Sequence, residues 1–406
     1  MMKLKTIKGG VCSAKGFRAS GVAAEIKYKG RNDVALIVAD SPAAAAAVFT
    51  TNKVAAAPVI YDREIIKGGK VQAILANSGC ANACTGDAGL KDAKLSALVT
   101  AGELGINPKH VLVASTGVIG RPLPMKRLLS GMKSAVASLG RTRAHGLAAE
   151  KAVMTTDTKP KEACVTTMIG GKKVTVGGMS KGSGMIEPNM ATMLGFITTD
   201  AKISSAMLKR ALLLAINKSF NRLVVDGDES TNDSVFLLSS GAAGNREIVK
   251  GGKDFDAFRE ALEAVCISLA RQMAADGEGA TKFVTVTVKG AKSEQDAARA
   301  ARAVAKSPLA KTSWFGRDPN WGRVLAAVGY SGAAVVDMKA EVFYDKVWAF
   351  RRGKVADEAQ LKKLAKVLKR DAFEVVVDLH LGKFESSVYT CDFSLDYVHI
   401  NADYTT

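Results

Sequence analysis

The chain has 406 residues, of which 48% are hydrophobic and 24% are charged, and its net charge is +18. This composition excludes an intrinsically disordered chain, no apolar run approaches the ~18 residues of a membrane-spanning helix, and the length indicates two or three domains or one large domain with a second lobe. The excess of Lys and Arg is spread over many segments without interleaved aromatic residues, which argues against a nucleic-acid partner and keeps a basic nucleic-acid-binding protein only as an alternative.

Runs of β-branched and apolar residues predict strands, and stretches with apolar residues at helical spacing predict helices between them. The expected strands cover residues 34–39, 71–76, 111–115, 223–225, 235–239, 283–288 and 373–379, and alternation over 388–400 predicts a last strand that runs almost to the C-terminus. The expected helices cover residues 87–104, 205–220, 254–275, 293–306 and 357–370. Strands and helices alternate, but some strands follow one another directly, which favours an α/β fold built of α+β layers.

A charge-rich stretch at residues 289–302 suggests a boundary between two lobes near residue 290. We therefore expect a main catalytic region over residues 1–290 and a second lobe over residues 291–406. The six cysteines are scattered without a C-x-x-C pair, so we expect reduced thiols and no metal site. Residues 1–17 are rich in lysine and lack the apolar region of a secretory signal, so a cytoplasmic protein is expected.

The segment 177–196 stands out because four glycines, at positions 177, 178, 182 and 184, lie within eight residues. Glycine permits positive φ angles and close backbone approach, so this run is expected to form a tight loop, and Pro188 prevents a helix from passing through it. Lys181 precedes Gly182, which is the wrong order for a phosphate-binding loop. The expected loop ends in Thr192, at the mouth of the apolar run 193–198, where a nucleophilic hydroxyl could be exposed.

Separate strings along essentially the whole chain carry a family resemblance. They are Lys15–Phe17, Phe49–Asn52, Ala76–Asn82, Ser115–Gly120, Met154–Thr158, Lys181–Met185, Asp226–Ser234, Trp321–Arg323 and Asn401–Tyr404. In this order they resemble the ornithine acetyltransferase family, also called the bifunctional glutamate N-acetyltransferase/amino-acid acetyltransferases. Many strings in one order are far more specific than any single motif.

The resemblance implies a self-cleaving acyltransferase fold of the N-terminal-nucleophile type. The precursor would cleave itself between Ala191 and Thr192, giving chains 1–191 and 192–406. The Thr192 hydroxyl would then be the nucleophile, and its freed α-amine, with a reference pKa of about 7.7–8, would be the base. The family places the oxyanion hole at Thr116 and Gly117, which follow the expected strand 111–115.

The resemblance also implies a set of substrate-binding residues: Thr155, Lys181, Thr192, Glu278, Asn401 and Thr406. Lys181 suits an α-carboxylate, and Glu278 suits the δ-ammonium of ornithine. The C-terminal segment would thus return to the active site. Thr156 and Thr158 stay open as alternatives to Thr155. The acidic residues at 226, 228 and 233 are interpreted as structural or substrate-adjacent, because the family uses no metal.

The implied activity is transfer of an acetyl group from N-acetylornithine to glutamate through a Thr192 acetyl-enzyme, by a ping-pong mechanism, in arginine biosynthesis. The implied assembly is a heterotetramer of two α and two β chains, with small-molecule substrates, no cofactor and no membrane partner. Some family members also take acetyl from acetyl-CoA, and no residue decides whether this chain uses it as a co-substrate. The alternative enzyme is an N-terminal-nucleophile aminopeptidase or amidase, in which water reaches the acyl-enzyme.

Overall fold

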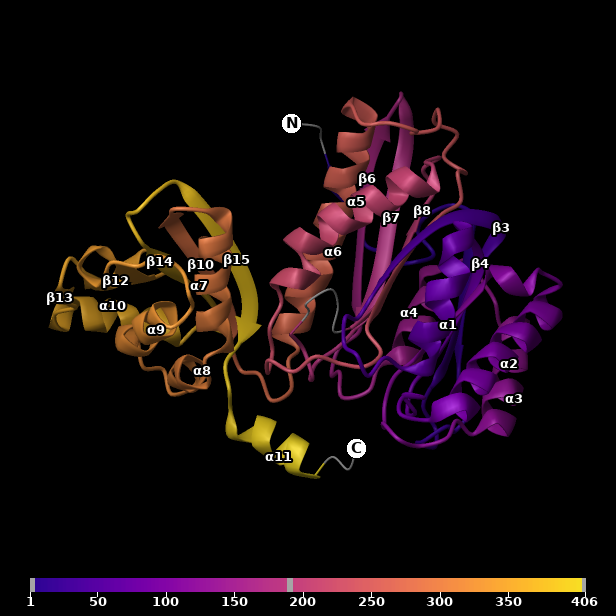
Figure 1. Cartoon of the computed structure of the whole chain (residues 1–406), viewed down its shortest axis with the longest axis horizontal. Coiled ribbons are helices and arrows are strands. Elements are labelled where there is room, and N and C mark those ends of the chain that lie inside the picture. The colour runs from indigo at the N-terminus through magenta and orange to yellow at the C-terminus, as the bar shows by residue number, and fades with distance from the viewer. Residues whose placement is uncertain (1–3, 188–192, 404–406) are drawn as a thin grey trace.

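The structure is a computed structural model that describes residues 4–187 and 193–403. Two β-sheets lie side by side, and helices pack on each of them (Figure 1). The expected α/β fold of layered sheets and helices is confirmed. No helix within the described ranges is both long and apolar enough to span a membrane.

The first sheet has nine strands among the described residues, in the order β1-β6-β7-β8-β9-β3-β4-β5, with β2 beside β3. Its strands are β1 (Lys5–Thr6), β2 (Phe17–Val22), β3 (Val34–Phe49), β4 (Lys70–Asn77), β5 (Val111–Ser115), β6 (Lys161–Ile169), β7 (Lys172–Lys181), β8 (Leu194–Thr199) and β9 (Ser234–Ser239). Side chains alternate between its two faces, so Phe196 packs in one apolar cluster and Ile197 in another. Both faces of the sheet are therefore buried.

Helices cover the two faces of this sheet. The pair α5 (Ser205–Lys218) and α6 (Lys253–Ala275) packs on the face of Ile197, and α4 (Arg143–Val153) packs against β2 and β3 on the face of Phe196. The β3–β4–β5 end carries α1 (Ala57–Ile65), α2 (Gly86–Leu104) and α3 (Met125–Ala137). Short 3-10 helices are η1 (Ile66–Gly68), η2 (Pro108–His110), η3 (Phe220–Arg222) and η4 (Asp337–Lys339).

The second sheet has the order β13-β12-β11-β14-β10-β15. Its strands are β10 (Phe283–Ala291), β11 (Glu341–Tyr344), β12 (Val347–Arg351), β13 (Lys354–Val355), β14 (Ala372–Asp378) and β15 (Phe384–Cys391). The helices that follow β10 are α7 (Glu294–Lys306), α8 (Pro308–Phe315), α9 (Trp321–Gly329), α10 (Glu358–Leu368) and α11 (Leu395–Asp403). The boundary expected near residue 290 falls within β10. Because β10 pairs with β14 and β15, we propose that the second lobe begins at this strand.

Two expected strands are wrong. Residues 223–225 are buried but join the second sheet only through a single bridge to β15. Residues 388–400 do not form one strand, because β15 ends at Cys391 and α11 begins at Leu395. Between them, the Asp392 carboxylate accepts the backbone N–H groups of Thr281 and Lys282, which precede β10. These two bonds hold the chain away from the sheet after β15.

The expected loop around the four glycines is also partly wrong, because Gly177 and Gly178 lie inside β7. A Cβ at Gly177 would lie 2.3 Å from the carbonyl oxygen of Gly10, so this glycine permits close packing of two backbone segments. Strand β7 ends at Lys181, and β8 begins at Leu194 and pairs with it in antiparallel orientation. The candidate cleavage junction thus lies in the connection between two neighbouring strands.

Candidate functional site

A cleft of about 800 Å³, including space open to solvent, lies where several strand ends of the first sheet meet α6 and α11. The residues that line it are Ala81, Thr116, Gly117, Ile119, Thr155, Thr156, Lys181, Gly182, Gly184, Met185, Met193, Leu194, Ser230, Thr231, Asn232, Asp233, Glu278 and Asn401. Six of the expected site residues are among them. They come from five separate stretches of the chain, which the fold brings together at one edge of the sheet.

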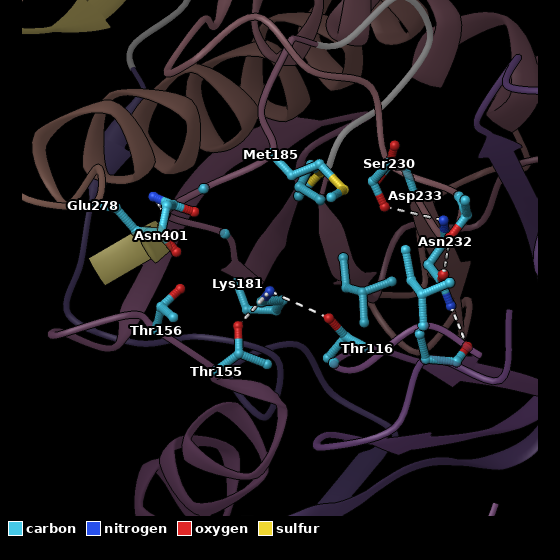
Figure 2. A pocket seen from close by; sticks show the side chains of 18 residues that line it. Thr116, Thr155, Thr156, Lys181, Met185, Ser230, Asn232, Asp233, Glu278 and Asn401 are labelled. Atoms are coloured by element: carbon cyan, nitrogen blue, oxygen red, sulfur yellow. Dashed lines mark hydrogen bonds between the residues drawn. The ribbon is translucent and has the colours of Figure 1, made fainter. Parts of the chain in front are cut away.

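Lys181 lies at the centre of the cleft, at the end of β7 (Figure 2). Its ammonium donates to the hydroxyl of Thr155 at 2.9 Å and to the hydroxyl of Thr116 at 3.3 Å. Burial lowers the pKa of Lys181, while the nearby carboxylate of Asp157 raises it again. The lysine therefore joins the two threonines in one polar network.

Thr116 and Gly117 follow β5, as expected for residues exposed at a strand end. The N–H of Thr116 donates to the carbonyl of Asn77 at 3.0 Å, so this donor is already used. Gly117 has a φ of +128°, and a Cβ there would lie 2.5 Å from the carbonyl carbon of Gly79, so only glycine fits. No backbone bond from the Gly117 N–H is found within the described ranges. The Thr116 hydroxyl and the Gly117 N–H thus remain as donors to a ligand.

Glu278 and Asn401 form the opposite side of the cleft (Figure 2). The N–H of Glu278 donates to the carbonyl of Ser183 at 2.8 Å, which fixes its backbone just beyond α6. The Asn401 amide donates to a Glu278 carboxylate oxygen at 2.9 Å. A Cβ at Gly184 would lie 2.3–2.6 Å from the two carboxylate oxygens of Glu278, so any larger residue there would displace the carboxylate.

The three neighbouring threonines have different surroundings. Thr155 and Thr156 line the cleft, and the Thr156 hydroxyl lies 2.7 Å from the hydroxyl of Ser183. Thr158 instead bonds to the Asp276 carboxylate through both its N–H and its hydroxyl. The geometry therefore leaves Thr155 and Thr156 as the candidates for substrate contact.

The segment before β9 contributes Asn232, to which the sequence analysis gave no role, and Asp233, which it interpreted as structural or substrate-adjacent. The Asn232 amide donates to the carbonyls of Ala81 and Ser115 at 2.6 and 2.8 Å, which ties the segment before β9 to the end of β5. Asp233 lines the cleft and is buried, and this burial raises its pKa well above the ordinary value against the opposing effects of Ser230 and Lys181. Their position in the sequence could have indicated a site, because these polar residues immediately precede the expected strand 235–239.

Two acidic residues of the loop 226–233 have different surroundings. Asp226 accepts the backbone N–H groups of Met185 and Ile186 at 2.6 and 2.7 Å and so supports the wall of the cleft. Among the described residues, no group of three or more His, Cys, Asp or Glu side chains could hold a metal ion. The loop is therefore structural at Asp226 and faces the cleft at Asp233.

Three expected residues, Ala191, Thr192 and Thr406, lie outside the described residues. The chain resumes at Met193, and both Met193 and Leu194 line the cleft. The carbonyl of Met193 accepts the N–H of Ser234, so the start of β8 is held beside β9.

Comparison with known proteins agrees with the resemblance found in the sequence. The ArgJ family model matches residues 18–406. The arginine biosynthesis bifunctional protein ArgJ of Geobacter sulfurreducens is 52% identical over 97% of this chain and 100% of that protein. The glutamate N-acetyltransferase of Methanocaldococcus jannaschii is 48% identical over 99% of this chain and 100% of its own length.

A solved structure was also found by similarity. The crystal structure of ornithine acetyltransferase complexed with ornithine from Mycobacterium tuberculosis is 40% identical, with a TM-score of 0.44, and covers 47% of this chain and 100% of that chain. The family match and the identity to relatives over their full length confirm the resemblance. The chain belongs to the ArgJ family.

Proposed function

We propose that this chain transfers an acetyl group from N-acetylornithine to glutamate through an acetyl ester on Thr192. Its place among the acetyltransferases of arginine biosynthesis follows from its family and from full-length relatives at about half identity. The observation that carries the finer proposal is the arrangement of Lys181 between two threonine hydroxyls, with Glu278 on the opposite side of the same cleft. Met193, to which Thr192 is covalently bonded, lines that cleft.

The first step of the proposed mechanism is self-cleavage. The Thr192 hydroxyl attacks the carbonyl carbon of Ala191, the peptide C–N bond breaks, and the α-amine of Thr192 leaves as the ester forms. Water then hydrolyses this ester and regenerates the hydroxyl. The products are chains 1–191 and 192–406, and the second begins with a free α-amine. The described residues that line the cleft include no histidine, which supports this amine as the base.

The second step is formation of the acetyl-enzyme. The Thr192 oxygen attacks the acetyl carbonyl of N-acetylornithine, and the α-amine takes the hydroxyl proton and returns it to the leaving amine of ornithine. The oxyanion of the tetrahedral intermediate would accept from the Gly117 N–H and the Thr116 hydroxyl. Because Lys181 donates to the oxygen of Thr116, the Thr116 hydroxyl keeps its own proton for the oxyanion.

Glutamate then attacks the ester carbonyl through its neutral α-amine, the ester C–O bond breaks, and the Thr192 oxygen takes up the proton that the amine loses as N-acetylglutamate leaves. One amide replaces another of the same kind, so the reaction needs no energy source or cofactor. Lys181 would pair with the substrate α-carboxylate, Glu278 with the δ-ammonium of ornithine, and Thr155 and Asn401 would donate further bonds. Four further points rest on the family resemblance alone. Thr406 would be a sixth binding residue, and acetyl-CoA would be a second acetyl donor. The assembly would be α2β2, and the location would be cytoplasmic.

The test combines processing with turnover. Purified protein should give two bands on a denaturing gel, and N-terminal sequencing of the second should begin Thr-Met-Leu. Thr192→Ala should stay intact and inactive, whereas Thr192→Ser should cleave and turn over slowly. Ornithine release from N-acetylornithine should depend on glutamate, with N-acetylglutamate formed in equal amount. Release at the same rate without glutamate would identify an amidase instead, and full activity of Thr192→Ala would exclude the nucleophile.

A further inference from the structure

Three charged side chains that the proposed mechanism does not use form a buried cluster behind the cleft. Lys161 donates to an oxygen of Asp157 at 2.7 Å and to an oxygen of Asp276 at 2.6 Å. The exposed fractions of the three side chains are 1%, 0% and 7%. The third donor position of Lys161 goes to the carbonyl of Lys159 at 3.2 Å, so the ammonium is fully satisfied.

Asp157 connects this cluster to two walls of the cleft. One of its oxygens accepts the N–H of Gly182 at 2.7 Å, immediately after Lys181, and the other accepts the N–H of Thr155 at 3.0 Å. Burial alone would raise the pKa of Asp157, but the charges of Lys181 and Lys161 hold it at about 2. Asp157 is thus a fixed anion that sets the positions of Thr155 and of the end of β7.

Asp276 connects the same cluster to the third wall. It caps the C-terminal end of α6, two residues before Glu278. Its carboxylate accepts the N–H groups of Thr158 and Lys159 as well as the ammonium of Lys161. Through Lys161, the turn that carries Glu278 is joined to the strand end that carries Lys181.

A buried ion cluster of this kind is weak evidence for a stabilising role, because desolvation offsets much of the attraction and apolar replacements are often neutral or better. What the cluster supplies here is a set of fixed positions, since its bonds join the segment of Thr155 to the strand end at Gly182 and to the turn at Asp276. We propose that Lys161, Asp157 and Asp276 are positioning residues that fix the separation between Lys181 and Glu278, and thereby the length of the amino-acid side chain that the site accepts. The inference rests on the proposed function, in which these two groups bind the two ends of ornithine.

The test measures discrimination between two donors that differ by one methylene. With glutamate as the acceptor, kcat/KM is determined for Nα-acetylornithine and for Nα-acetyl-lysine, in the wild type and in Asp276→Asn. One methylene in a fitted pocket gives about 10–200-fold discrimination, so we expect a preference of that size in the wild type. In Asp276→Asn the preference should fall by about tenfold or more. A ratio taken on one preparation is independent of the fraction of enzyme that is folded.

A matched control lies on the same helix. Glu263 is a buried carboxylate that pairs with Arg259 and Lys218 and does not line the cleft. Glu263→Gln therefore makes the same kind of change and should leave the preference unchanged. Thr158→Val removes one hydroxyl donor to Asp276 while all three charges remain, and it should also lower the preference if Asp276→Asn does not fold.

The outcomes separate the inference from the function on which it rests. A wild type that does not transfer acetyl from N-acetylornithine would refute the proposed function. A wild type that transfers but does not discriminate between the donors would refute the inference alone. The inference is also overturned if the folded cluster variants keep the wild-type ratio within twofold, or if Glu263→Gln lowers the ratio as much as Asp276→Asn does.

Discussion

Asn401 donates a hydrogen bond from its side-chain amide to the carboxylate of Glu278 over 2.9 Å, although 123 positions separate the two residues. None of the described residues of α11, on which Asn401 lies, is buried. The contact that Asn401 makes with the cleft is thus a polar one to a single carboxylate oxygen, and it leaves the Glu278 carboxylate free to accept a further donor from a ligand.

The first prediction concerns this carboxylate. Glu278→Gln should lower kcat/KM for N-acetylornithine by about 10–150-fold, because a charge-assisted bond contributes about 1.5–3 kcal/mol. The amide can still accept from Asn401, so the fold around it should persist. The KM for glutamate should not rise, because glutamate has no ammonium at its side-chain end. Steady-state kinetics with each substrate varied check both statements, and equal losses for both substrates would contradict a role in binding the ammonium.

The second prediction uses the packing of Gly184 on Glu278. Gly184→Ala should reduce kcat/KM for N-acetylornithine about as strongly as Glu278→Gln, because the added methyl occupies the place of the carboxylate. Gly102→Ala is the control. Gly102 lies inside α2 with no atom near its missing Cβ, so alanine there should be neutral or stabilise by up to about 1 kcal/mol. Wild-type kinetics for Gly184→Ala would mean that Glu278 can bind substrate from another position.

The third prediction isolates the hydroxyl of Thr116. Thr116→Val keeps the shape of the side chain and removes the hydroxyl, so kcat should fall by about 10²–10³-fold with little change in KM. Thr116→Ser keeps the hydroxyl and should retain most of the activity. Single-turnover measurement of ornithine release reports the acetylation step directly. A kcat for Thr116→Val within a few-fold of the wild type would remove Thr116 from the oxyanion hole.

Much of the secondary structure was predictable because local signals decide it. The helices expected at 293–306 and 357–370 differ from α7 and α10 mainly at their ends. Ser293 and Asp357 are N-caps, and each side chain accepts the backbone N–H of the residue three positions later. The C-terminal helix was missed because the alternation that begins in β15 continues in residue type beyond Cys391. Long-range bonds such as those of Asp392 hold the chain in its new direction there, and these do not appear in a local pattern.

The site could be predicted in part for a similar reason. A resemblance carried over residue by residue finds positions such as Thr116 and Lys181, but it does not reveal what supports them. Asn232 acts through the carbonyls of two distant segments, and Lys161 acts through two carboxylates more than 100 positions apart. Contacts of this kind depend on tertiary packing and have no signature in residue spacing.

The fourth prediction concerns stability and pH. Glu150 in α4 is buried, neither of its oxygens has a partner within the described part of the chain, and burial raises its pKa from about 4.5 to about 8. The native state therefore holds one more proton than the unfolded state between these values. The contribution of Glu150 to the free energy of unfolding is complete below about pH 4.5 and is lost as the pH rises towards about 8, by at most about 1.4 kcal/mol per pH unit.

Glu150→Gln removes this dependence, so its stability relative to the parent should increase steadily from pH 5 to pH 8. The measurement is chemical unfolding at several pH values in the Thr192→Ala background, in which the chain is expected to stay intact. Glu64→Gln makes the same substitution at an exposed carboxylate and serves as the control. A difference for Glu150→Gln that is constant across this range would show that the carboxyl ionises normally.

The junction between β7 and β8 has a consequence for how the enzyme is made. These strands pair from Val176–Thr199 to Lys181–Leu194, in the middle of a sheet that is covered on both faces. Under the proposed cleavage, each product contributes one of two adjacent strands, so neither product can complete the sheet without the other. The precursor needs only to fold, whereas a denatured mature enzyme must first bring two molecules together. Recovery of the mature enzyme after denaturation would therefore depend on its concentration. The peptide bond joins the two strands only while the precursor folds, and its cleavage removes that help for any later refolding.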